Sequence, residues 1–358
     1  MNHVSELHLT SEEKTNLNLL EITDKGILTD VIDKNRLAGS LVLPDSVIEI
    51  GDYAFSDCSG LTSIVIPDSV TVIGEAAFFG CTGLTTIAVP GSITDIGNGA
   101  FAACVNLMQL TVDNANAVYC GEDNIIYTKD KKSLVAVAAG LKDSIVIPNT
   151  VSEIRRHAFS GCSGLTSIMI PDGITEIGDY AFSEYTGLTS IVIPDSVTVI
   201  GDHAFSGCSG LTSIVIPDSV TTISGAAFSE CTGLTGIKLP SCITKIGICV
   251  FSRCTSLTGV TIPDTINVIG LFAFSECTSL TDVIIPDSVR EIHFFAFSKC
   301  TGLTNIVIPD SVTSIGGNAF EEINPNAHFT VKSESVKELL VNSGSNIQDE
   351  QITVEPRL

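Results

Sequence analysis

The sequence predicts a solenoid built mostly from β-strands, in which successive coils stack along one axis. Two observations predict this fold class: a 23-residue segment recurs eleven times, and the same apolar positions recur inside each copy. A fixed period of this length is typical of arrays whose units cannot bury their apolar side alone. The copies begin at Leu41, Ile64, Ile87, Ile145, Ile168, Ile191, Ile214, Ile237, Val260, Val283 and Ile306.

The apolar positions of the repeat predict the core. Counted from the first residue of a copy, positions 1, 3, 7, 10, 15 and 21 are apolar. Position 10 is isoleucine in every copy, from Ile50 to Ile315, and position 15 is phenylalanine, from Phe55 to Phe320. Burying each such side chain stabilises a coil by about 1.5 to 3 kcal/mol, which the entropy of ordering the coil offsets. We therefore expect ladders of identical side chains that run through neighbouring coils.

The elements of one coil follow from the residues between these positions. The stretch L-T-S-I-V-I is a predicted strand, which the proline at position 4 of every copy ends because proline lacks an amide hydrogen. Asp and Ser follow the proline and predict a turn whose side chains hydrogen-bond the local backbone. Glycine at position 11, as in Gly51 and Gly74, predicts a bend with positive φ. The A-F-S-x-C stretch predicts a single helical turn.

Nine of the twelve cysteines share position 18 of the repeat, so they should stack on one another. Neighbouring strands lie about 4.8 Å apart, which exceeds the roughly 3.8 Å between β-carbons of a relaxed disulfide. We expect buried free thiols, which favours a reducing environment, and no metal site because paired ligand spacings are absent. The nine are Cys58, Cys81, Cys104, Cys162, Cys208, Cys231, Cys254, Cys277 and Cys300.

Charge and motifs exclude several function classes. The 41 acidic and 18 basic residues give a formal net charge of −23, which repels nucleic acid and anionic membrane surfaces. No apolar stretch approaches the roughly 20 residues that span a bilayer, and the first residues lack the pattern of a secretory signal. No catalytic, phosphate-binding or dinucleotide motif stands out from the repeat. We therefore expect neither catalytic residues nor a cofactor.

The pattern L-x-x-I-x-I-P-x-S-V-x-x-I-G-x-x-A-F-x-x-C resembles the 23-residue leucine-rich repeat of the BspA-like family of bacterial and protist surface proteins. It covers residues 41–320 apart from one interruption. The resemblance implies a curved right-handed solenoid of α/β type, with a parallel sheet on its concave side and short helical turns on its convex side. It also implies adhesion to host or matrix proteins at the cell surface or after secretion. The reduced cysteines also fit the cytoplasm, so the compartment stays open.

The chain divides into three predicted regions. Residues 1–40 form an N-terminal cap, which begins with a capping box at Thr10 and Glu13. Residues 41–320 form the solenoid, and residues 321–358 form a C-terminal cap with a short helix and a last strand. Caps at both ends shield the open edges of the array, so we expect a monomer.

The period fails between residues 110 and 144, where the sequence predicts a β-hairpin. Residues 124–128 and 133–137 form its strands, and Lys129-Asp130-Lys131-Lys132 forms its turn. One interpretation is a projecting recognition arm with a basic tip on an acidic protein. The other is an elongated coil that stays packed in the array.

Candidate binding residues stand where the later copies depart from the repeat. Positions 12 and 13 are expected to face solvent, with pairs such as Asp179-Tyr180 and Asp202-His203, but in three later copies they are Ile248 and Cys249, then Leu271 and Phe272, then Phe294 and Phe295. Adjacent coils bring these side chains into one apolar patch, the kind of surface that marks an interaction site. Alternatively, the patch is packed more tightly there or covered by the C-terminal cap.

Two further candidates lie on the expected concave face. Lys238 replaces the valine of position 2, and Asp282 adds a charge at position 23 of the following copy. Protein recognition is the usual use of such a face. The sequence thus predicts a non-enzymatic scaffold that binds a protein partner, and the alternative is a structural surface-coat component without one specific site.

Overall fold

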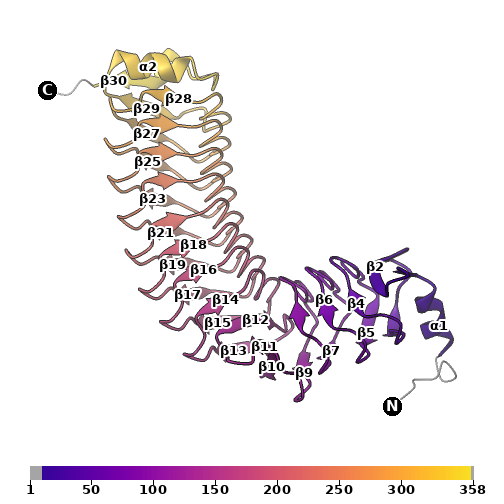
Figure 1. Ribbon diagram of the computed structural model, residues 1–358. Helices are drawn as coiled ribbons and strands as arrows, with labels where there is room; N and C mark the ends of the chain where they lie inside the picture. Colours follow the sequence, from indigo (N-terminus) through magenta and orange to yellow (C-terminus); the bar gives the residue numbers. More distant parts are fainter. Residues whose placement is uncertain (1–9, 356–358) are drawn as a thin grey trace. The chain divides into compact units, whose positions relative to one another are not determined.

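The computed structural model describes residues 10–355 (Figure 1). The chain forms two compact units, which divide between Leu165 and Thr166. In both units the 23-residue copies are coils of a solenoid, as predicted, and most of the strands pair in parallel. No helix among residues 10–355 is both long and apolar enough to cross a membrane.

Unit 1 begins with a capped helix. Thr10 and Glu13 form the predicted capping box at the start of α1, and the buried Asn16 side chain donates to the carbonyls of Ala38 and Ser40 at 2.7 and 2.8 Å. These bonds fix the helix on the first coil. The elements of the unit are α1 (Ser11–Leu17), β1 (Leu20–Ile22), β2 (Ile27–Val31), β3 (Gly39–Val42), β4 (Glu49–Ile50), β5 (Leu61–Val65), β6 (Val72–Ile73), β7 (Thr86–Val89), β8 (Asp95–Ile96), β9 (Gln109–Val112), β10 (Tyr119–Glu122), β11 (Ile125–Thr128), β12 (Ser133–Val137), β13 (Asp143–Val146) and β14 (Glu153–Ile154).

The irregular segment of unit 1 contains the predicted hairpin. Strands β11 and β12 pair antiparallel, and β12 also pairs in parallel with β14 of the next copy. Ile125, Ile126 and Leu134 are buried, so the hairpin is packed into the array. The lysines of its turn are held within the unit, since Lys129 donates to the Asn116 carbonyl and Lys131 pairs with Glu122. The interpretation as a projecting basic arm is therefore wrong.

Unit 2 is a regular stack of coils that α2 covers at its C-terminal end (Figure 1). Its elements are β15 (Leu165–Met169), β16 (Glu176–Ile177), β17 (Ser190–Val192), β18 (Val199–Ile200), β19 (Ser213–Val215), β20 (Thr222–Ile223), β21 (Gly236–Lys238), β22 (Lys245–Ile246), β23 (Gly259–Thr261), β24 (Val268–Ile269), β25 (Asp282–Ile284), β26 (Glu291–Ile292), β27 (Asn305–Ile308), β28 (Ser314–Ile315), β29 (His328–Val331), α2 (Glu334–Val341), a 3-10 turn (Asp349–Gln351) and β30 (Ile352–Val354).

Each regular copy contributes two strands to two parallel sheets. A longer strand covers the start of the copy and a two-residue strand covers positions 9 and 10. The register is one full repeat: Ile191 pairs with Ile214 in one sheet, and Ile200 pairs with Ile223 in the other. The two sheets enclose the core, where the Phe205 and Phe228 rings stack 5.4 Å apart and within 2° of parallel. The predicted ladders of identical side chains are thus present.

The glycine of position 11 has a different role from the one predicted. Gly51, Gly74 and Gly97 do not have positive φ. A Cβ at Gly74 would lie 2.6 Å from the Asp52 nitrogen, and one at Gly97 would lie 2.4 Å from the Glu75 nitrogen. Position 11 favours glycine because the backbone of the preceding coil approaches too closely for a side chain.

Positive φ occurs instead at positions 13 and 17 of the copies. Tyr180 (55°) and Glu184 (57°) show both in one coil. The segment between them, like its equivalents, consists of hydrogen-bonded turns rather than a regular helix. Its amides also reach the next coil: the Phe182 N–H donates to the Ala204 carbonyl at 2.8 Å. These bonds form a third line of contact between coils.

The cysteine column is buried, and its thiols donate hydrogen bonds between coils. The twelve cysteines, all within the described residues, are free. The Cys208 thiol donates to the Phe182 carbonyl and the Cys231 thiol to the Phe205 carbonyl, both at 3.1 Å. Burial raises the pKa of Cys162 to about 12, so the thiol stays protonated and unreactive at neutral pH.

In several coils the serine of position 6 bonds to the preceding coil rather than to its local backbone. The Ser196 hydroxyl donates to the Ile174 carbonyl at 2.6 Å, and the Ser219 hydroxyl donates to the Val197 carbonyl at 2.8 Å. The prediction of local hydrogen bonds at this turn was therefore wrong for the serines. The threonines of position 22 act similarly, since Thr258 donates to the Thr235 carbonyl.

Candidate functional site

The structure brings five of the predicted binding residues together on the turn side of unit 2. We call Ile248, Leu271, Phe272, Phe294 and Phe295 the apolar stripe. The rings of Phe272 and Phe295 stack with centroids 4.9 Å apart and planes within 5°. Ile248 and Phe294 are 56% and 57% exposed, and the other three are half-buried.

Backbone geometry fixes how the stripe is presented. Phe272 and Phe295 have φ of 54° and 57°, a conformation that costs a residue with a side chain about 1 kcal/mol or more. The Phe272 N–H donates to the Phe294 carbonyl at 3.2 Å, and the Phe295 N–H donates to the Gly317 carbonyl at 3.3 Å. The contacts between coils therefore hold both aromatic side chains in one direction.

The stripe occupies the position at which three other coils, those of Asp52, Asp179 and Asp202, accept a hydrogen bond from the next coil. At position 12 the Asp179 carboxylate accepts the Asp202 N–H at 2.8 Å, and the Asp202 carboxylate accepts the Gly225 N–H at 2.7 Å. Ile248, Leu271 and Phe294 occupy the same position and have no polar group with which to accept. Coil packing alone does not explain this change, because the aspartates connect their coils better.

The C-terminal cap leaves the stripe accessible. Its helix α2 packs against β28, β29 and β30, and the cap meets the solenoid at Asn318, whose N–H donates to the Ser343 carbonyl. The exposed fractions of Ile248 and Phe294 show that neither is covered.

Lys238 and Asp282 lie elsewhere, on the outer face of the longer strands. Lys238 ends β21 beside Thr261 of β23, and both are exposed. The Asp282 carboxylate accepts from the Thr281 hydroxyl at 2.6 Å and from the Asn305 amide at 2.7 Å, and these bonds lower its pKa. The structure does not bring this pair together with the apolar stripe.

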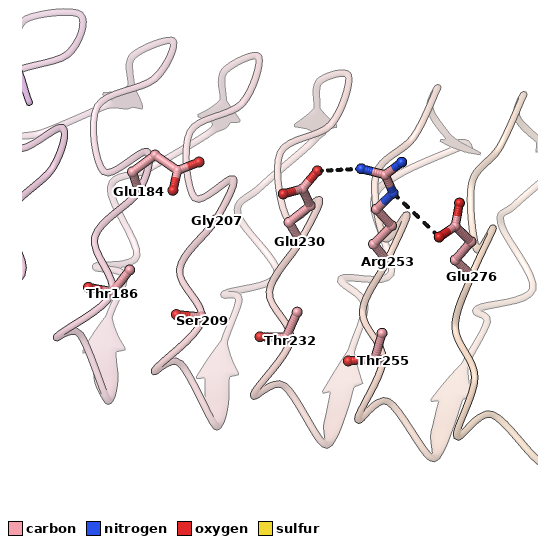
Figure 2. Close-up of a pocket in the computed structure, with 9 residues that line it drawn as sticks. All are labelled: Glu184, Thr186, Gly207, Ser209, Glu230, Thr232, Arg253, Thr255 and Glu276. Carbon is pink, nitrogen blue, oxygen red and sulfur yellow. Dashed lines mark hydrogen bonds and ion pairs between the residues drawn. The ribbon is translucent and has the colours of Figure 1, made fainter. Parts of the chain in front are cut away.

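A groove that the sequence analysis missed runs along unit 2 at positions 17 and 19. Figure 2 shows its charged residues in one row and its hydroxyl groups in a second, parallel row. The cavity has a volume of about 330 Å³. Its lining residues are Glu184, Thr186, Gly207, Ser209, Glu230, Thr232, Arg253, Thr255 and Glu276.

The charged row of the groove contains a bridging cation. One nitrogen of Arg253 lies 3.0 Å from Glu230 Oε1, and another lies 3.5 Å from Glu276 Oε2. The Glu230 hydrogen bond and the charge of Glu276 raise the Arg253 pKa further. These pairs are half-exposed, so each contributes about 0 to 1 kcal/mol to stability.

The described residues supply no metal site: among residues 10–355, no three His, Cys, Asp or Glu side chains lie where they could hold an ion together. The carboxylates of the groove are spaced along the coils, whereas a hard cation needs oxygens that converge from several directions.

Comparison with known proteins identifies the repeat. A family model described as "BspA type Leucine rich repeat region (6 copies)" matches residues 34–133, 141–258 and 221–348. No curated protein sequence matches the chain.

Solved structures have the same fold. A leucine-rich repeat protein from Bacteroides ovatus is 28% identical, with a TM-score of 0.61 over 95% of this chain and 91% of that one. A leucine rich cell surface protein from Faecalibacterium prausnitzii is 24% identical, with a TM-score of 0.57 over 92% and 96%. A leucine-rich repeat protein from Eubacterium ventriosum is 23% identical, with a TM-score of 0.58 over 85% of this chain and 92% of that one. With its repeat matched over most of its length, the chain belongs to the BspA-type leucine-rich repeat family.

Proposed function

We propose that the protein is a non-catalytic scaffold that binds a host or matrix protein through the apolar stripe of unit 2. The observation that carries the proposal is the change at position 12, where exposed apolar side chains replace aspartates that connect the coils. Aromatic side chains held in place lose little entropy on binding, and phenylalanine is among the residues enriched in the cores of protein interfaces.

The comparisons support the same role. The Faecalibacterium prausnitzii relative is described as a cell surface protein, where adhesion needs a stable binding surface rather than an active site. Lys238 and Asp282, on the other face, would then contribute to orientation of the partner instead of the central contact.

The test compares two stacked pairs at the same repeat position. Binding of the full chain to an immobilised extracellular-matrix preparation is measured for wild type, Phe272→Ser/Phe295→Ser, and Tyr180→Ser/His203→Ser. The Tyr180 and His203 rings also stack, 4.6 Å apart, but beside aspartates. We expect saturable wild-type binding that falls at least about tenfold in the phenylalanine variant and stays near wild type in the control.

Thermal unfolding of the same three proteins separates binding from folding. The melting temperature should stay nearly unchanged in both variants, because the rings lie outside the core. Equal loss of binding in the two variants, or self-association of the wild type in place of saturable binding, would contradict the proposal; self-association would favour a coat component.

A further inference from the structure

The charged row of the groove follows the repeat, with one residue per coil at position 17. It reads Glu184, Gly207, Glu230, Arg253 and Glu276. All five have φ between 57° and 73°, so the backbone presents each residue in the same way. In chain order, a carboxylate occupies every second coil of the row.

The two coils between the carboxylates differ in one respect. At Arg253 a guanidinium connects the carboxylates on either side, Glu230 and Glu276. At Gly207 the carboxylates on either side are Glu184 and Glu230, but glycine supplies no cation to connect them. The protein therefore contains both a filled and an unfilled form of the same arrangement (Figure 2).

The surroundings of Gly207 can admit a ligand. The cavity of about 330 Å³ extends along this part of the row, and the hydroxyl groups of Thr186, Ser209 and Thr232 line its other side. The Glu184 carboxylate leans over Gly207, since a Cβ there would lie 2.5 Å from Glu184 Oε1. This carboxylate is the end of a flexible, exposed side chain, so it can move aside for an incoming group.

We infer that the groove accepts an arginine or lysine side chain of the partner protein above Gly207, between Glu184 and Glu230. The inference rests on the proposed function, to which it adds the chemistry of the partner: a basic segment that reaches the groove beside the apolar stripe. The net charge of −23 attracts such a segment. The Arg253 bridge shows which geometry a guanidinium adopts between two of these carboxylates.

The nearness of groove and stripe supports a single partner. Cys249, in the coil that carries Ile248, is close enough to Arg253 for the arginine charge to affect its thiol. In each coil the position 13 carbonyl accepts the N–H of position 16, as between Cys249 and Ser252 at 3.1 Å, so one turn separates the two surfaces.

The test places an arginine of the protein itself between Glu184 and Glu230. Gly207→Arg places a guanidinium at a position where Arg253 already tolerates the same backbone, and the variant should fold normally. The matched control is Gly80→Arg. Gly80 has φ of 69° and also lies under a carboxylate, that of Asp57, but its neighbour on the other side in the row is Ala103 rather than a glutamate.

The probe is a fluorescein-labelled peptide of alternating arginine and glycine. A control peptide has citrulline in place of each arginine, which keeps the side-chain shape and removes the charge. Anisotropy at low salt measures the affinity. We expect the arginine peptide to bind wild type and Gly80→Arg similarly, and Gly207→Arg about tenfold more weakly. Equal weakening in the two variants would show attraction to net charge alone and overturn the inference, as would equal binding of both peptides.

A second variant tests the inference in the opposite direction. Arg253→Gly removes the internal cation and opens a second place between Glu230 and Glu276, so the arginine peptide should bind more tightly than to wild type. Unchanged affinity would overturn the inference. Because these readouts use the peptides, they stand apart from the matrix-binding result for Phe272→Ser/Phe295→Ser.

Discussion

Two aromatic pairs occupy position 13 of unit 2 and differ in what surrounds them. Tyr180 and His203 stack beside aspartates that hydrogen-bond to the next coil, whereas Phe272 and Phe295 stack beside exposed apolar side chains. The backbone is the same, with positive φ at all four residues. The comparison teaches that the coil keeps the same backbone conformation with either set of side chains at positions 12 and 13, so these positions can serve recognition without a change of fold.

The buried cysteines run through the core beneath both aromatic pairs, and they should give the strongest change in the free energy of unfolding, as a function of pH. An unfolded thiol has a pKa near 9.0, and burial raises the pKa of Cys58 and Cys162 to about 12 in the folded chain. Their stabilising contribution is full below pH 9 and is lost as pH rises from 9 to 12. In that window, the free energy of unfolding should fall by about 1.4 kcal/mol per pH unit for each such thiol.

Chemical unfolding at pH 8 and pH 10 measures this loss. In the variant with both Cys231 and Cys254 replaced by Ala, the free energy of unfolding should fall less steeply with pH, because two of the buried thiols are gone. An equally steep dependence in that variant would contradict the assignment to the buried column.

Buried and exposed phenylalanines should differ in how much they contribute to the free energy of unfolding. Phe251→Ala removes a fully buried ring that stacks on Phe228 and Phe274, and we expect a loss of about 3 to 5 kcal/mol in the free energy of unfolding. Phe294→Ala removes the same atoms from an exposed site and should cost far less. Similar losses at both sites, measured by denaturant titration, would place Phe294 in the core.

The hydrogen bond between coils at Asp202 should give a smaller change in stability. Asp202→Ala removes the acceptor of the Gly225 N–H, and it should lower the free energy of unfolding by about 1 kcal/mol. Asp264→Ala removes the same charge from an exposed turn and should stay within about 0.5 kcal/mol of wild type. Equal effects would show that charge, rather than the connection between coils, is measured.

The sequence predicted the elements that repeat with one residue type. Phenylalanine at position 15, cysteine at position 18 and the proline-terminated strand all lie where the pattern indicated, because burial and the lack of an amide hydrogen restrict those positions to few residue types. It also predicted the apolar stripe, since three adjacent departures from a polar pattern are visible without coordinates.

Two features could not be read from the sequence. Positive φ falls at positions 13 and 17, which hold residues as different as Tyr180, Cys249 and Arg253, so composition carries no signal there. The groove depends on contacts between residues 23 apart, and its unfilled place becomes visible only when Gly207 is seen between two glutamates. The prediction of positive φ at the position 11 glycine was wrong for a related reason, because what restricts this position to glycine is the close backbone of the neighbouring coil.

The substitution Phe294→Asn tests the central claim most directly, namely that the C-terminal coils give up a connection in order to display a binding surface. Asparagine can accept the Gly317 N–H as Asp202 accepts that of Gly225, without a change of net charge. Denaturant unfolding should show a free energy of unfolding about 1 kcal/mol higher than wild type, together with weaker binding to the matrix preparation. A lower free energy of unfolding with unchanged binding would show that Phe294 serves the stability of the solenoid and would contradict the account.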